Sequence, residues 1–252
     1  MSTTAPRRDI LGVSLDAFTM EQAVARCVAA VENRENLTIG VVNAAKAVHM
    51  REDALLRDSV TSCDLVLADG QAVVWASRLL GHPLPERVAG IDLFTELMAE
   101  GARRSYRAYF LGARPEVLER VVAEVRHRYP GLEVAGARDG YFTDEQAAEV
   151  AARIGEAKPD LLFLGMTSPK KEIFLARFAE EINAGVIHGV GGSFDVLAGK
   201  VRRAPTLWQR LGAEWLYRFL QEPLRLGPRY LSTNTRFAWM VVKEYVQART
   251  RA

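Results

Sequence analysis

The stretch YRAYFLGARPE at Tyr106–Glu116 decides the fold class. Its apolar run, YRAYFL, ends at a single glycine, and the Arg-Pro-Glu that follows puts proline and then an acid into the first turn of a helix. The same alternation of a short apolar run with a helical stretch continues through Leu132–Ala135, Leu161–Leu164 and Val186–Val190. Apolar strands and helices at this spacing predict an α/β fold, a parallel sheet with helices on both faces.

The first hundred residues repeat this pattern less regularly. Strands are expected near Ile10–Ser14, Leu37–Val42 and Leu65–Leu67, and helices over residues 21–31 and 71–80. No linker rich in proline, glycine or serine divides this region from the next. We therefore expect residues 1–205 to form one Rossmann-like α/β core.

The strand pattern stops after residue 205. Apolar residues between Leu207 and Leu220 fall on one helical face, and a second helix is expected over Phe237–Val246. These features predict a helical C-terminal appendage over residues 206–252.

Charge is distributed unevenly along the chain, although the formal net charge is only +2. Residues 1–199 carry a net charge of −6, whereas residues 200–252 carry +8 and three of the four tryptophans. A basic, tryptophan-rich segment indicates a polyanionic partner. It fits either a helix pair packed on the core or an amphipathic surface in the headgroup region of an anionic membrane.

The composition is ordinary for a globular protein, with 49% hydrophobic and 25% charged residues. No apolar run approaches the ~20 residues that span a bilayer, and the N-terminal residues contain no secretory signal. Cys27 and Cys63 have neither zinc-ligand spacing nor a CxxC motif. We therefore expect a cytoplasmic protein with reduced thiols.

Polar residues and glycines follow several of the expected strands. In a parallel sheet these loops meet at one edge, where ligands bind. Asp69 follows LVLA and precedes glycine, so it is either a turn former or a general base aimed into the cleft. Asp195 either caps the next turn or accepts hydrogen bonds from ribose hydroxyls, and Gly191 and Gly192 permit either a tight turn or close approach to a ligand.

Several enzyme classes lack their motifs in this chain. Neither GxGxxG nor GxxxxGK[ST] occurs, which disfavours a nicotinamide dehydrogenase and a P-loop ATPase. There is also no Asp-x-Asp pair to hold a divalent ion against a diphosphate, and the four histidines have no ligand spacing. Negative charge on a leaving group would then be stabilised by backbone N–H groups and by C-terminal arginines. Alternatively, these arginines form a solvated basic face.

Ordered stretches along nearly the whole chain resemble the WecG/TagA/CpsF glycosyltransferases (glycosyltransferase family 26). They are DILGVSLDAFT (9–19), ADGQAVVWASRLLG (68–81), PERVAGIDLF (85–94), FLGARPEV (110–117), YPGLEVAGARDGYF (129–142), GMTSPKKE (165–172), HGVGGSFDVLAGKVRRAP (188–205), EWLYRFLQEPLR (214–225) and RYL (229–231).

The resemblance implies a Rossmann-like, metal-independent, inverting transferase that uses a UDP-sugar and needs no cofactor. The acceptor it implies is a sugar carried on undecaprenyl diphosphate, in the synthesis of cell-surface polysaccharide or exopolysaccharide. It further implies that the C-terminal appendage attaches the protein to the inner face of the cell membrane and completes the active site. The transferred sugar would be N-acetylmannosamine or a related unit.

Carried over residue by residue, the resemblance makes Asp69 the catalytic base, Asn43 the asparagine of the family's T-x-N segment and Arg87 the arginine of its ERVxG segment. Asp195, with Gly191 and Gly192 beside it, matches the nucleotide side of the site. The appendage arginines that would close over the diphosphate are Arg218, Arg225 and, as a third, Arg229.

Two positions depart from the family pattern. Val41 replaces the threonine two residues before Asn43, and Lys171 replaces the glutamine of the PKQE segment. Lys171 would either add a cation to the diphosphate site or select a different donor sugar. Two alternatives stay open: a glucuronosyl or hexosyl transferase of this family, and a non-catalytic protein that binds sugar nucleotides. A nucleic-acid partner is not expected, and homo-oligomerisation is left open.

Overall fold

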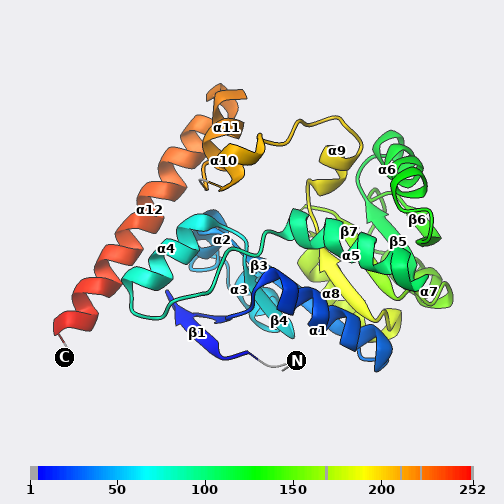
Figure 1. Ribbon diagram of the computed structural model, residues 1–252, viewed down its shortest axis with the longest axis horizontal. Helices are drawn as coiled ribbons and strands as arrows, with labels where there is room; N and C mark the ends of the chain where they lie inside the picture. The colour runs from blue at the N-terminus through cyan, green and yellow to red at the C-terminus, as the bar shows by residue number, and fades with distance from the viewer. Residues whose placement is uncertain (1–4, 168–169, 211, 222, 251–252) are drawn as a thin grey trace.

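The computed structural model describes residues 5–167, 170–210, 212–221 and 223–250. Its centre is a six-stranded sheet in the order β4-β3-β8-β7-β5-β6, in which all neighbouring strands are parallel (Figure 1). The strands are β3 (Leu37–Val42), β4 (Leu65–Ala68), β5 (Arg107–Gly112), β6 (Glu133–Arg138), β7 (Leu161–Gly165) and β8 (Val186–Gly189). The predicted α/β class and its parallel sheet are confirmed.

Side chains that alternate along each strand build a core on both faces of the sheet. On β5, Phe110 packs in one cluster and Leu111 in another, and Phe163 and Leu164 divide in the same way on β7. One face is covered by α1 (Met20–Glu32), α5 (Gly90–Arg104), α6 (Pro115–Arg128) and the short α9 (Ser193–Leu197). The other is covered by α2 (Ala44–His49), α3 (Ala54–Thr61), α7 (Ala147–Glu156) and α8 (Lys170–Ile182).

The N-terminal strand differs from the prediction. Instead of one strand near Ile10–Ser14, an antiparallel hairpin forms from β1 (Arg7–Ile10) and β2 (Val13–Asp16), apart from the main sheet. The reversal occurs at Leu11 and Gly12, which both have positive φ angles, 56° and 76°. Only glycine adopts such angles at little cost, so Gly12 is the sequence feature behind the turn.

Three helices follow residue 205: α10 (Thr206–Arg210), α11 (Glu214–Gln221) and α12 (Pro223–Thr250). The prediction of one helical face from Leu207 to Leu220 was wrong, because Gly212, with a φ of 69°, separates α10 from α11. The predicted helix over Phe237–Val246 is the second half of α12. At 1.5 Å per residue, α12 is about 42 Å long.

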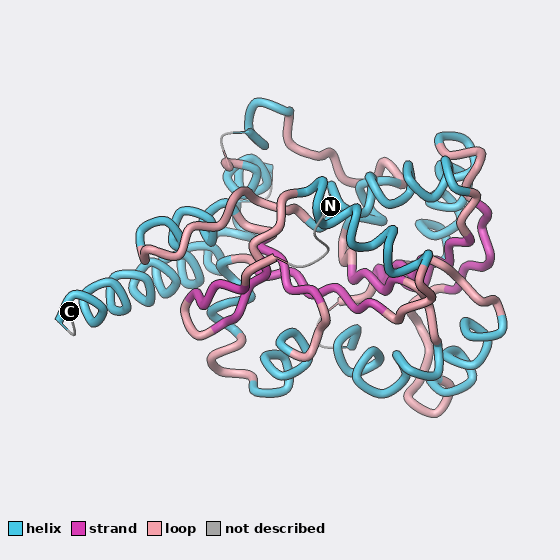
Figure 2. The backbone as a smooth tube through the Cα atoms, turned by 60° about the horizontal axis from the view of Figure 1, so that its bottom comes forward, coloured by secondary structure: helices cyan, strands magenta, loops and turns pink. Residues whose placement is uncertain are grey.

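Helix α12 packs against α2 and against a cluster that also contains the β1–β2 hairpin and α4 (Gln71–Leu79). Phe237, Met240 and Val241 of α12 are buried in this cluster. Beyond it, the C-terminal end of α12 extends away from the core (Figures 1 and 2). None of the helices in the described ranges combines the length and the apolar character that crossing a bilayer requires.

Candidate active site

A cavity of about 870 Å³ lies at the carboxyl ends of β3, β4 and β8, and α11 and α12 form part of its wall. It brings together five of the residues that the sequence nominated: Asn43, Asp69, Arg87, Gly192 and Asp195. Gly191 and Lys171 do not line it. Arg218 belongs to α11, and Arg225 and Arg229 belong to α12, but their side chains lie outside the described part of the chain.

Asn43 and Asp69 are neighbours because their strands are. Val42 pairs with Ala68 in the parallel register of β3 and β4, so the residue after each strand emerges at the same edge. The Asn43 Nδ2 donates to Asp69 Oδ2 at 3.4 Å, while its Oδ1 accepts from the Lys46 backbone N–H at 3.0 Å and caps α2. Asn43 therefore connects the start of a helix to the proposed base.

The second oxygen of Asp69 is held by the start of α5. Asp69 Oδ1 accepts from the Gly90 backbone N–H at 2.8 Å, and the N-terminus of a 15-residue helix is a favourable place for negative charge. The carboxylate is half-buried and lines the cavity, so it is both oriented and accessible to a ligand.

Gly70 permits this arrangement. A Cβ at this position would lie 3.1 Å from the Asn43 Cβ and 3.2 Å from its Cα, which is tighter than ordinary contact. The glycine after Asp69 thus allows the β3 and β4 loops to approach each other closely.

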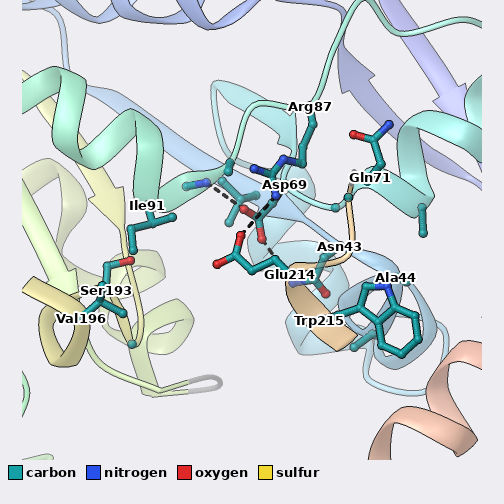
Figure 3. A pocket seen from close by; sticks show the side chains of 18 of the residues that line it. Asn43, Ala44, Asp69, Gln71, Arg87, Ile91, Ser193, Val196, Glu214 and Trp215 are labelled. Carbon is teal, nitrogen blue, oxygen red and sulfur yellow. Dashed lines mark hydrogen bonds and ion pairs between the residues drawn. The ribbon is translucent and has the colours of Figure 1, made fainter. Parts of the chain in front are cut away.

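Four charged side chains join the core to the C-terminal helices, and two of them, Arg87 and Glu214, line the cavity. Arg87 Nη1 lies 3.4 Å from Glu214 Oε2 on α11, and its Nη2 lies 3.5 Å from Asp92 Oδ2 on α5. Arg203, from the segment before α10, pairs with the same two carboxylates. Figure 3 shows Arg87 and Glu214 close to Asp69 at the centre of the cavity. Both arginines are thus already paired with carboxylates.

The loop after β8 lies on another side of the cavity. Gly191 has a φ of 52°, which favours glycine, and a Cβ on Gly192 would meet open space. The Asp195 carboxylate pairs with Lys200 at 3.4 Å, and its backbone carbonyl accepts from Lys200 and Val201. Gly192 and Asp195 therefore leave room for a ligand beside a short helix.

Lys171 lies behind the cavity, where its side chain packs over Gly189. Its Nζ is 3.4 Å from Glu172 Oε1, and Lys46 Nζ is 3.7 Å from the same oxygen. Burial, together with the charge of Lys171, lowers the pKa of Lys46 to about 8. These three side chains border a separate cavity of about 20 Å³.

His188 is completely buried on β8, and its Nε2 donates to the Gly90 carbonyl at 2.9 Å. Burial lowers the pKa of His188 to about 4, although this hydrogen bond acts in the opposite direction. His188 is therefore neutral near pH 7 and supports the residue that orients Asp69.

Four residues of this region were not predicted as site residues from the sequence: Glu214, Trp75 and Trp215, which line the cavity, and Asp92, which pairs with its arginines. Glu214 carried one detectable signal, because it is one of three acidic residues in the basic segment 200–252. Across the described residues, no three His, Cys, Asp or Glu side chains are grouped so that they could hold a metal ion.

The sequence matches a known protein family. The family model for the glycosyl transferase WecG/TagA/CpsF family matches residues 8–251. An N-acetylglucosaminyldiphosphoundecaprenol N-acetyl-beta-D-mannosaminyltransferase of Bacillus spizizenii (strain ATCC 23059 / NRRL B-14472 / W23) is 40% identical over 166 residues. This match covers 66% of the chain and 64% of that relative. The chain belongs to the WecG/TagA/CpsF family of glycosyl transferases.

Proposed function

We propose that the chain transfers a sugar from a UDP-sugar to a sugar acceptor carried on undecaprenyl diphosphate, with inversion at the anomeric carbon and without a metal ion. The observation that carries this proposal is the placement of Asp69 at the edge of the cavity, oriented by Gly90 and Asn43 and close to Arg87. The relative's name supplies the acceptor class and an N-acetylmannosamine-type sugar.

In the proposed reaction, Asp69 takes the proton of an acceptor hydroxyl. The hydroxyl oxygen forms a bond to the anomeric carbon while the bond from that carbon to the UDP oxygen breaks on the opposite face. A positioned general base of this kind contributes about 10²–10⁴-fold in rate. UDP leaves with the negative charge, and the proton stays on Asp69 until solvent removes it.

The departing diphosphate needs positive charge close by. Arg87 lines the cavity, and the family resemblance adds Arg218, Arg225 and Arg229 from the appendage. Because the sequence has no Asp-x-Asp pair, we assign this role to guanidinium groups and strand-end N–H groups rather than to a divalent ion. Gly192 and Asp195 would contact the nucleotide.

We also propose that the basic C-terminal segment contacts an anionic membrane surface, which would place the enzyme at the inner face of the cell membrane. Trp239, Val242 and Val246 on α12 are all at least half exposed and lie on one side of the helix. An apolar stripe of this kind beside basic residues suits an interfacial helix.

A panel of UDP-sugars tests the proposal, each incubated with a polyprenyl-diphosphate sugar in the presence and absence of a chelator, with product mass as the readout. Wild type should form product in both conditions, and Asp69→Asn should lose about 10²–10⁴-fold in turnover. Asp64→Asn is the matched control. Asp64 lies at the amino end of β4, opposite the end that Asp69 follows, and its carboxylate accepts hydrogen bonds from Thr38. UDP binding without transfer from any donor would support the non-catalytic alternative instead.

A further inference from the structure

We infer that the polyprenyl chain of the acceptor leaves the cavity between α4 and α11, across the indoles of Trp75 and Trp215. This inference rests on the proposed function, because it takes a lipid diphosphate as the acceptor. It assigns a lipid-binding subsite to one particular end of the cavity.

The two ends of the cavity differ in character. Ile91, Ser193 and Val196 lie on one side, whereas Gln71 and Trp215 lie on the opposite side (Figure 3). The first side contains the glycine loop and Asp195, which suit a nucleotide. Asp69 lies between the two sides, and both substrates must meet there. If the nucleotide occupies the first side, the second side is left for the acceptor.

The second side is held in place by a tight contact. A Cβ on Gly212 would lie 2.4 Å from Gln71 Cγ, so the turn before α11 sits directly on the first residue of α4. Trp75 follows Gln71 by one helical turn, and Trp215 follows Gly212 by three residues. The two tryptophans therefore belong to the two helices that meet at this contact.

These indoles lie where the lipid should begin. Trp75 and Trp215 both line the cavity, and 53% and 45% of their surfaces are exposed. At 1.5 Å per residue, Trp75 lies about 6 Å along α4 from Gln71, which is itself two residues after Asp69. The proposed subsite therefore places the sugar and diphosphate of the acceptor between Asp69 and the two indoles.

Apolar surface continues outward from this exit. Leu79, one turn after Trp75 on α4, is 52% exposed. A half-exposed indole with apolar neighbours suits an isoprenoid chain that passes from a polar site to a bilayer. Exposed Trp239 does not line the cavity, which separates the chain's path from general membrane contact.

Calorimetric titration of the full chain, with UDP present to occupy the donor site and no membrane or detergent, tests this subsite. The probes are farnesyl diphosphate and inorganic pyrophosphate. Wild type should bind farnesyl diphosphate at least tenfold more tightly than pyrophosphate. Trp75→Ala and Trp215→Ala should each weaken farnesyl diphosphate binding about tenfold and leave pyrophosphate binding unchanged. Leu55→Ala, at an exposed leucine of α3, should change neither.

Three results would overturn the inference: equal affinity of wild type for the two probes, no effect of either cavity variant, or an equal loss in Trp239→Ala. The last result would place the chain on the outer face of α12. Because these measurements do not depend on turnover, a failure of sugar transfer would refute the proposed function and leave the lipid subsite standing.

Discussion

Arg87 Nη1 lies 3.4 Å from Glu214 Oε2, so an arginine of the core and a carboxylate of the C-terminal helices form an ion pair inside the cavity. Both side chains are largely buried, at 16% and 12% exposure, and Arg203 and Asp92 complete the group. The position of α11 over the site therefore depends on charges at the site itself.

Glu214→Gln should loosen the C-terminal helices. Removing this carboxylate takes a charged partner from Arg87 and Arg203, and the free energy of unfolding should fall by about 2 kcal/mol. Limited proteolysis should cut near residues 200–215 faster than in wild type. Glu149→Gln is the matched control, because its pair with Arg153 is exposed and should contribute less than 1 kcal/mol. Equal protease resistance of wild type and Glu214→Gln would show that other contacts hold the appendage.

Asn43→Ser should separate helix capping from orientation of the proposed base. Serine still caps α2, so stability should change by less than about 0.5 kcal/mol. The amide that donates to Asp69 is lost, and turnover should fall about five- to tenfold, the size expected for one hydrogen bond. Asp53→Ser makes a similar change at the cap of α3, away from the cavity, and should keep full turnover. If the two variants have the same turnover, Asn43 acts only as a cap.

The strands and their edge residues could be predicted because local patterns specify them. Apolar runs predicted the ends of the six strands of the main sheet to within three residues, and Asn43 and Asp69 are neighbours because they follow adjacent parallel strands. The ion group around Glu214 could not be predicted this way. Its four members come from three separate segments, and only the tertiary fold brings them together.

The errors have similarly specific causes. Gly12 and Gly212 both adopt positive φ angles, and each divides an apolar stretch that periodicity alone reads as one element. Lys171 is a different case: its side chain packs over Gly189 and lies near Glu172, and its contact with a ligand stays a prediction. Side-chain direction at such loops is set by packing, and a single sequence does not specify it.

Trp239→Glu together with Val242→Glu should weaken binding to anionic vesicles. Each full burial of an apolar side chain contributes about 1.5–3 kcal/mol, and the new carboxylates also repel the surface, so cosedimentation should fall at least tenfold. Leu55→Glu changes an equally exposed leucine on α3 and should bind as wild type does. Unchanged binding of the α12 double variant would mean that this stripe faces something other than a membrane.

Acid should destabilise the protein through His188. The pKa of this buried imidazole is lowered from 6.5 to about 4, so the folded state favours its neutral form. The resulting stability is fully present above pH 6.5 and is lost as the pH falls toward 4, a loss on the order of 3 kcal/mol. His188→Gln keeps an amide that can donate to the Gly90 carbonyl but cannot titrate, so its unfolding free energy should decline less over this range. Urea unfolding of both proteins at pH 7, 5.5 and 4.5 measures the difference. The unfolding free energy of wild type, relative to that of His188→Gln, should be higher at pH 7 than at pH 4.5. If the unfolding free energies of both proteins fall in parallel, other groups cause the acid sensitivity.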